Sequence, residues 1–189
     1  MPAGDAWFAG AAEDRARAAD LVVRVLGLLK QTVATAESLT GGMIASTLVD
    51  IPGVSAVYRG GLVVYATDLK HALAGVDEAL LTERGPVDPD VAVALAAGAR
   101  QRCGADWAVA TTGVAGPDPQ DGKPVGLVYT GVAGPFATSV RELRLDGGRA
   151  EIRAQAVTAA LAHLGDELRG SDPGIAGWPP AFSRAGEPA

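Results

Sequence analysis

The sequence lacks most of the features by which disulfide-rich and nucleic-acid-binding proteins are recognised. One cysteine in 189 residues excludes an internal disulfide and a thiolate-rich metal site, which suits a reducing compartment. The 16 Lys and Arg residues are outnumbered by 22 Asp and Glu residues, and no basic run interrupts the net charge of -6. Because binding to a phosphate backbone needs clustered positive charge, nucleic acid is not expected as a partner.

Long apolar runs are also missing. No stretch reaches the roughly 18 to 20 unbroken apolar residues of a membrane span. Residues 1–5 place no positive charge ahead of an apolar core, so they do not predict a secretory signal. We therefore expect a cytoplasmic protein without a membrane partner.

The composition that is present suits one globular domain. Apolar residues make up 48% of the chain and charged residues 20%, which is enough to bury a full core. Periodic segments fill residues 11–168, after an N-terminal extension of residues 1–10. Residues 169–189 are rich in Gly, Pro, Ala and Ser, which predicts an irregular tail.

Hydrophobic periodicity predicts a chain of mixed helices and strands. Helices are expected at 11–30, 43–49, 67–76, 78–84, 89–103 and after 149, and strands at 32–36, 59–65, 107–112, 125–132 and 138–145. The second strand, an unbroken Leu-Val-Val-Tyr run, should be buried on both faces, and the alternating fifth strand should lie at an edge. The dozen residues before the fourth strand show no helical pattern, so that strand should return antiparallel. This order predicts an α/β fold, a three-layer α/β/α sandwich around a mostly parallel sheet.

Residues 32–42, Thr-Val-Ala-Thr-Ala-Glu-Ser-Leu-Thr-Gly-Gly, form the stretch around which the chain is organised. Their spacing puts the Ser38 hydroxyl just past the carboxyl end of a buried strand and leaves the N–H groups of Gly41 and Gly42 at a helix N-terminus. A nucleophile and an anion cradle would then lie within one turn of each other. Alternatively, Thr40 is an ordinary helix cap and the glycines only form a turn.

Two further loops follow the ends of strands. Tyr65 ends the second strand, and Lys70 lies on the flank of the next short helix; taken singly, they would be a core aromatic and a solvated lysine. The third strand ends in residues 112–117, a second glycine-punctuated loop. Because the carboxyl ends of parallel strands meet at the edge of the sheet where ligands bind, these loops should converge with Ser38.

Four motifs follow one another along the chain. They are Ala-Glu-Ser-Leu-Thr-Gly-Gly at 36–42, the strand at 61–65 with Lys70 five residues on, Thr-Gly-Val-Ala-Gly-Pro at 112–117, and Gly-Lys-Pro-Val-Gly at 122–126. Together they resemble the CinA carboxyl-terminal domain family over about residues 12–166. The resemblance implies a mixed five-stranded sheet of order 2-1-3-4-5 with strand 4 antiparallel. It also implies the stand-alone form, since the amino-terminal domain of longer CinA proteins is absent here.

The active members of that family are nicotinamide mononucleotide (NMN) deamidases, also called PncC. The resemblance implies hydrolysis of the NMN carboxamide to nicotinate mononucleotide and ammonia, with a small-molecule nucleotide as partner and no metal or other cofactor. Ser38 matches the nucleophile, and Tyr65 and Lys70 match the residues assigned to its activation. The substrate-binding residues implied by the motifs are Glu37, Thr40, Gly41, Gly42, Thr112, Gly113, Arg149 and Arg153.

The residue types suit this chemistry. A serine nucleophile needs a nearby base, and a lysine in a partly desolvated site can be neutral enough to serve. Of the two arginines near the start of the last helix, Arg153 is favoured as the match to the family. Backbone N–H groups of the 41–42 glycine pair or of Gly113 are candidates for the oxyanion hole and the phosphate site.

The sequence departs from the family pattern in places, so other hypotheses remain. Leu39 stands where the family usually has Cys, Gly-Gly-Arg at 147–149 where it has Gly-Asp-Arg, and 118–121 where it has a glycine-rich loop. A second hypothesis is a nucleotide-binding or protein-interaction module that keeps the site for binding only. A third is a metal-dependent nucleotide hydrolase using Asp118 and Asp121, carboxylates that more often form turns. A homodimer is also expected.

Overall fold

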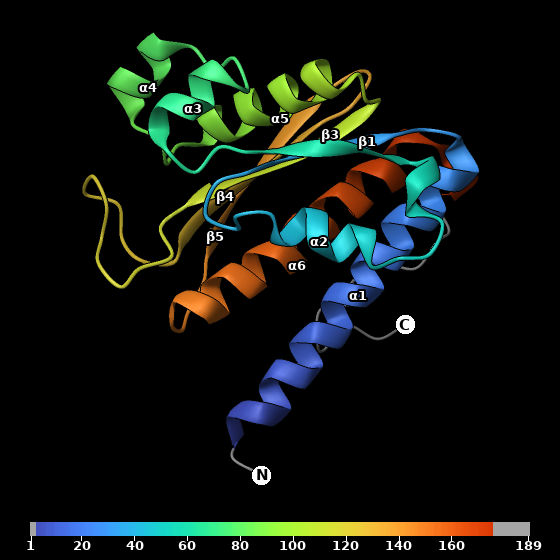
Figure 1. The fold of residues 1–189 in the computed structure, drawn as a ribbon, viewed down its shortest axis with the longest axis horizontal. Helices are drawn as coiled ribbons and strands as arrows, with labels where there is room; N and C mark the ends of the chain where they lie inside the picture. The colour runs from blue at the N-terminus through green and yellow to red at the C-terminus, as the bar shows by residue number, and fades with distance from the viewer. Residues whose placement is uncertain (1–2, 176–189) are drawn as a thin grey trace.

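A computed structural model describes the backbone of residues 3–175 and the side chains of residues 12–175. The strands form a single sheet, and helices cover both of its faces (Figure 1). The helices are α1 (Ala3–Leu29), α2 (Met43–Val49), α3 (Thr67–Ala72), α4 (Glu78–Arg84), α5 (Pro89–Cys103) and α6 (Arg149–Ser171). The strands are β1 (Val33–Glu37), β2 (Tyr58–Val63), β3 (Trp107–Gly113), β4 (Leu127–Ala133) and β5 (Thr138–Arg144). Short 3-10 helices cover Val54–Ala56 and Pro173–Ile175.

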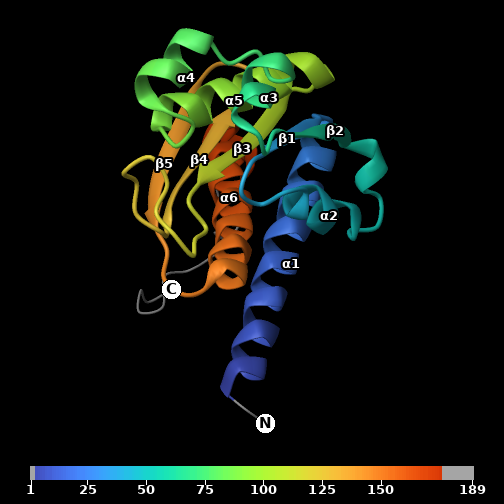
Figure 2. The ribbon, with the colours of Figure 1, turned by 60° about the vertical axis from the view of Figure 1, so that its left-hand side comes forward.

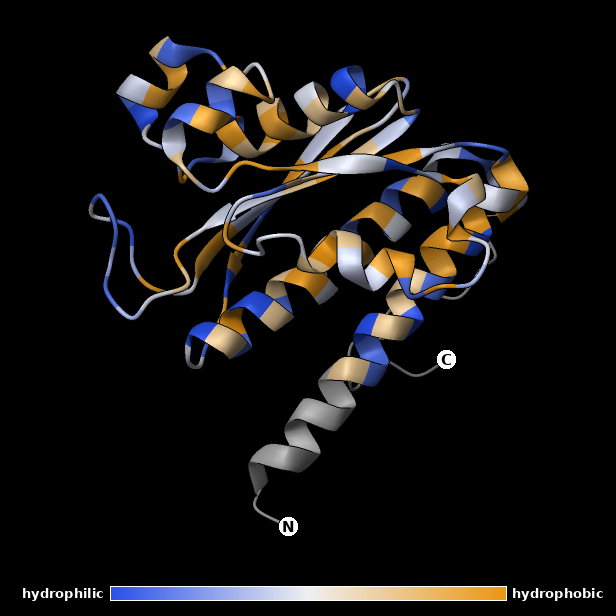
Figure 3. Cartoon of the chain, in the orientation of Figure 1, coloured by the Kyte–Doolittle hydropathy of each residue, from blue (hydrophilic) through white to orange (hydrophobic). Residues whose placement is uncertain are grey.

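The sheet has the order β2-β1-β3-β4-β5. Strand β1 pairs in parallel with β2 and β3, whereas β4 runs antiparallel to both β3 and β5. The predicted order and the antiparallel fourth strand are confirmed. The connection before β4 forms a small hairpin with a bridge between Gln120 and Lys123, and Figure 3 shows it as a hydrophilic loop beside the sheet.

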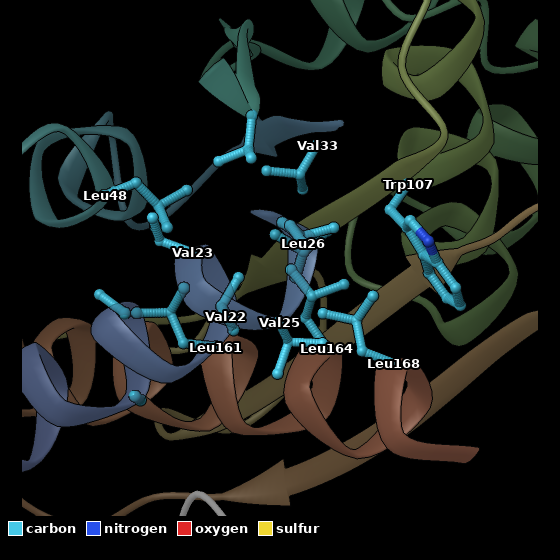
Figure 4. Close-up of a cluster of buried hydrophobic side chains, with 14 of the residues drawn as sticks. Val22, Val23, Val25, Leu26, Val33, Leu48, Trp107, Leu161, Leu164 and Leu168 are labelled. Carbon is cyan, nitrogen blue, oxygen red and sulfur yellow. The ribbon is translucent and has the colours of Figure 1, made fainter. Parts of the chain in front are cut away.

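Helices cover the two faces of the sheet in two groups. Figures 1 and 2 show α1, α2 and α6 on one face and α3, α4 and α5 on the other. In the first layer, Leu26 of α1, Leu164 and Leu168 of α6 and Trp107 of β3 belong to one buried cluster (Figure 4). On the other face the strands present small residues such as Ala108 and Ala110 to α5.

Close packing of α5 on the sheet depends on a glycine. A Cβ atom at Gly131 of β4 would lie 2.3 Å from the carbonyl oxygen of Ala92 in α5. Because real Cβ atoms do not approach an oxygen so closely, any larger residue would force α5 away from the sheet. The sheet and α5 are therefore held in a fixed relation to each other.

Three expectations about the elements need correction. Strand β2 lies at the sheet edge and is not buried on both faces: exposed residues alternate along it, with 50% of Val63 exposed, and it ends two residues before Tyr65. An apolar run alone does not distinguish such an edge from a central strand. Helix α1 begins at Ala3 rather than near residue 11, and its first turns extend away from the sheet (Figure 1).

At the other end of the chain, α6 continues to Ser171, past the expected start of the tail at 169. Residues 176–189 of that tail lie outside the described residues. None of the helices in the described part has both the length and the apolar character needed to cross a membrane.

Candidate active site

A pocket of about 180 Å³ lies at the carboxyl edge of the parallel strands. It is formed by the loops that follow β1, β2 and β3, together with the start of α6 and the turn before α5. Its lining residues are Ser38, Leu39, Tyr65, Thr67, Lys70, Pro86, Val87, Thr112, Gly113, Val114, Ala115, Gly116, Asp118, Gln120 and Arg149. The convergence of the three strand-end loops is thus as predicted.

Ser38 and Lys70 are in direct contact in this pocket. The Lys70 Nζ donates a hydrogen bond to Ser38 Oγ at 3.1 Å and another to the carbonyl oxygen of Val64 at 2.9 Å. Only 1% of Lys70 and 8% of Ser38 are exposed, so Lys70 is not the solvated residue that its helix position alone would suggest. Because side chains alternate along a strand, Ser38 shares the face of Ala34 and Ala36, which is the face that α3 covers.

The surroundings of Lys70 favour the neutral form of its amine. Burial lowers the pKa of Lys70 from its ordinary value to about 8, while the nearby Asp68 carboxylate acts in the opposite direction. An amine with this pKa is partly neutral near physiological pH. The hydrogen bond to the Val64 carbonyl fixes the amine beside the Ser38 hydroxyl, as a general base requires.

Tyr65 and Arg149 meet at the rim of the pocket. Arg149 donates from Nη2 to the Tyr65 hydroxyl at 2.7 Å and from Nη1 to the carbonyl oxygen of Gly116 at 2.8 Å. Among the hydrogen bonds of the described residues, the Tyr65 hydroxyl is joined to Arg149 and not to Ser38 or Lys70. Arg149 comes from the α6 layer and reaches the pocket because it is the first residue of that helix.

Glu37 does not line the pocket, although the motif suggested a substrate contact. Only 1% of it is exposed, and its carboxylate accepts hydrogen bonds from the N–H groups of Gly42, Ile44 and Ala45 at 2.8 to 3.0 Å. It faces the opposite side of the sheet from Ser38, since consecutive strand residues point to opposite faces. Glu37 therefore caps α2 from within the protein.

The N–H groups that were expected to bind an anion are already hydrogen-bonded within the protein. The N–H of Gly42 is bound by Glu37, and that of Gly41 donates to the Ser38 carbonyl oxygen at 3.1 Å. The Thr40 hydroxyl is hydrogen-bonded to that of Thr111. These groups lie behind the serine, so the structure does not place Thr40, Gly41 or Gly42 against a ligand in this pocket.

Of the two arginines of α6 that were expected to bind substrate, the one favoured from the sequence, Arg153, does not line the pocket. Arg153 lies behind the serine loop and donates to the carbonyl oxygens of Leu39 and Thr40 at 2.8 and 3.0 Å. Arg149, not Arg153, lines the pocket. Sequence alone could not separate them, because they are one helical turn apart and the crossing of α6 over the sheet decides which of them passes the edge.

Other groups around the pocket were not predicted from the sequence, or were predicted without a definite role. Thr112 and Gly113 line it as expected, although the Thr112 hydroxyl already donates to the carbonyl oxygen of Pro86 at 2.6 Å. Within residues 12–175, the N–H groups of Leu39, Ala115 and Gly116 find no acceptor, which makes them candidates for an oxyanion or phosphate site.

The turn before α5, residues 86–87, and Gln120 carried no sequence signal for a site. Asp118, considered from sequence only as a cation ligand, also lines the pocket. No group of three or more carboxylate, histidine or cysteine side chains suited to a metal ion occurs in the part of the chain that the structure describes.

The fold and the pocket define the class of protein first. It is a three-layer α/β/α domain that holds a buried serine–lysine pair at the carboxyl edge of its parallel strands. The chain belongs to the CinA family, because the model of the CinA C-terminal domain matches residues 15–168. The resemblance drawn from the four motifs is thereby confirmed.

Known relatives agree with this assignment. A CinA-like protein of Frankia casuarinae is 54% identical over 140 residues, which cover 72% of this chain and 32% of the relative. A putative competence-damage inducible protein of Desulforamulus reducens is 41% identical over 159 residues, or 84% of this chain and 39% of the relative. The chain thus spans between about a third and two fifths of the length of these curated relatives.

Solved structures show the same fold over nearly their whole length. The competence/damage inducible protein CihA of Agrobacterium tumefaciens superposes with a TM-score of 0.78 at 40% identity, covering 82% of this chain and 95% of that one. A CinA superfamily protein of Klebsiella pneumoniae superposes with a TM-score of 0.80 at 29% identity, covering 82% and 98%.

Proposed function

We propose that this domain hydrolyses the carboxamide of NMN to nicotinate mononucleotide and ammonia, with Ser38 as nucleophile and Lys70 as general base. The observation that carries the proposal is the buried contact between Lys70 Nζ and Ser38 Oγ, made by a lysine whose pKa is lowered to about 8. A hydroxyl with an adjacent, partly neutral amine is an activated nucleophile.

The reaction follows from this pair. The neutral Lys70 amine accepts the Ser38 proton as Oγ bonds to the carboxamide carbon, and the resulting ammonium then protonates the leaving nitrogen, so that the C–N bond breaks and ammonia departs. Water attacks the remaining ester, again giving its proton to Lys70, and the Oγ–C bond breaks to release the carboxylate. The proton returns to Ser38, which restores the enzyme.

The rim of the pocket supplies charge for the nucleotide part. Arg149 is cationic, exposed and already oriented by Tyr65 and Gly116, so it can bind the phosphate of NMN through charge-assisted hydrogen bonds. Because the N–H groups of Gly41 and Gly42 are used internally, we assign the phosphate to Arg149 and the N–H groups of Ala115 and Gly116. The carboxamide end would then point inward toward Ser38.

Turnover of NMN without added metal is the first expected result. Purified protein in the presence of a chelator should release ammonia and nicotinate mononucleotide in equal amounts, measured by an ammonia assay and by chromatography with mass detection. Ser38→Ala serves as the inactive control. No ammonia above a blank at high enzyme concentration, together with NMN binding seen by calorimetry, would instead favour a module that binds nucleotides without hydrolysing them.

Arg149→Ala should raise KM for NMN roughly 10- to 100-fold, because one charge-assisted contact to phosphate contributes about 1.5–3 kcal/mol. The same variant should change KM for nicotinamide riboside, which has no phosphate, by much less. The matched control is Arg144→Ala, which removes an exposed arginine that pairs with Glu142 on β5. Equal effects on both substrates would show that Arg149 does not bind the phosphate.

A further inference from the structure

Two buried or half-buried charged side chains hold the loop that carries Ser38 from the side away from the pocket. Glu37 accepts the N–H groups of Gly42, Ile44 and Ala45, and Arg153 donates to the carbonyl oxygens of Leu39 and Thr40. One side chain therefore fixes the donors of the loop and the other fixes its acceptors.

Burying the Glu37 carboxylate costs folding free energy, which an exposed helix cap does not. Its carboxylate is almost fully buried, and none of the ion pairs among the described residues includes it. A buried carboxylate needs strong compensation, which here comes from three backbone N–H groups at the start of α2. Exposed caps such as Asp77, which accepts from Ala79 N–H at the start of α4, do the same task without burial.

Glu37 acts directly on the geometry of the serine. It is bonded to Ser38 through one peptide, and its side chain reaches forward to residues 42–45, which closes the chain around Ser38 into a ring. The Ser38 N–H is held by the Thr111 carbonyl oxygen at 3.1 Å, and the Ser38 carbonyl oxygen is held by Gly41. Because Lys70 is itself fixed by Val64, a shift of this ring would move Ser38 Oγ away from the amine.

Given the role proposed above for Ser38 as nucleophile, we infer that Glu37 is a positioning residue that holds Ser38 Oγ in line with Lys70 without touching substrate. Arg153 supports it by holding the carbonyl oxygens of the same loop. A misplacement near 1 Å in such a pair lowers turnover by about 100-fold. The inference thus reassigns the glutamate of this motif from binding substrate to aligning the nucleophile.

Glu37→Gln is the test variant, because glutamine has the same shape but only one acceptor oxygen for three donors. We expect kcat for NMN to fall about 10- to 100-fold with KM within about twofold. A fluorophosphonate, whose phosphorus is attacked by a serine Oγ with loss of fluoride, should label Ser38 more slowly by a similar factor. The matched control is Asp77→Asn, the same change in a cap of α4, which should alter neither rate.

Each other outcome decides the matter. A raised KM with unchanged kcat would make Glu37 a substrate contact, and a lower Tm with unchanged kcat and labelling would make it a helix cap only; either overturns the inference. If wild-type protein does not hydrolyse NMN, yet its Ser38 is labelled faster than in Glu37→Gln, the alignment role stands and the proposed substrate fails.

Arg153→Lys tests the same loop should Glu37→Gln not fold. Lysine keeps the charge but loses the planar pair of donors that reaches two carbonyl oxygens. The same fall in kcat and in labelling is expected, with KM nearly unchanged. Wild-type rates in Arg153→Lys would show that the loop needs no such support and would overturn the inference.

Discussion

Ser38→Ala should lower NMN turnover by at least about 10³-fold, since the covalent route is lost with the nucleophile. The hydroxyl faces the pocket, and among residues 12–175 its side-chain partner is Lys70. Folding stability should therefore change by no more than about 1 kcal/mol, and NMN affinity should be nearly unchanged. Steady-state kinetics, thermal unfolding and calorimetric binding of NMN measure the three quantities separately.

The control for this variant is Ser46→Ala. Ser46 is an exposed serine on α2, eight residues further on and outside the pocket, so its loss should leave turnover intact. Substantial activity in Ser38→Ala, with ammonia still formed in proportion to NMN consumed, would mean that water attacks the amide directly and that Ser38 only positions it.

Much of the site was predictable because two simple rules apply to it. Carboxyl ends of parallel strands share one edge, which placed Ser38, Tyr65 and residues 112–117 together without any knowledge of packing. Spacing along the chain placed Lys70 on the helix that follows Tyr65. The order of the sheet came from the motif resemblance, and the antiparallel fourth strand from a connection with no helical pattern.

The unpredicted parts depend on which face a side chain takes. Alternation along β1 in fact requires Glu37 to face away from Ser38, so this error was avoidable from the sequence. The choice between Arg149 and Arg153 could not be made from the sequence, because it is set by how α6 crosses the sheet. The burial of Lys70 likewise depends on where α3 packs, which its own short apolar pattern does not specify.

Lys70 is the second residue whose loss should nearly abolish turnover. Its amine must be neutral to accept the Ser38 proton, and its pKa is lowered to about 8 by burial. The activity should therefore rise as pH increases through about 8 and level off above it, measured as kcat against pH. A limb centred near the ordinary lysine value of 10.5 would contradict the buried base.

The same pKa shift means that Lys70 lowers the free energy of unfolding near neutral pH. The folded state holds the proton less well than the unfolded chain, so stability is gained only as pH rises from about 8 toward 10.5, where both states become neutral. Lys70→Met should therefore be inactive and yet more stable than wild type near pH 7 by roughly 1–3 kcal/mol. The gain should shrink as the pH of the denaturant titration is raised above about 8.

Lys70→Arg separates charge from basicity at this position. Arginine keeps the positive charge beside Ser38 but does not lose its proton in proteins, so it cannot serve as the base. Turnover should fall almost as far as in Lys70→Met, and fluorophosphonate labelling of Ser38 should fall with it. If Lys70→Arg instead keeps most of the wild-type kcat, the residue acts as a fixed positive charge, and the Ser38 proton leaves by another route.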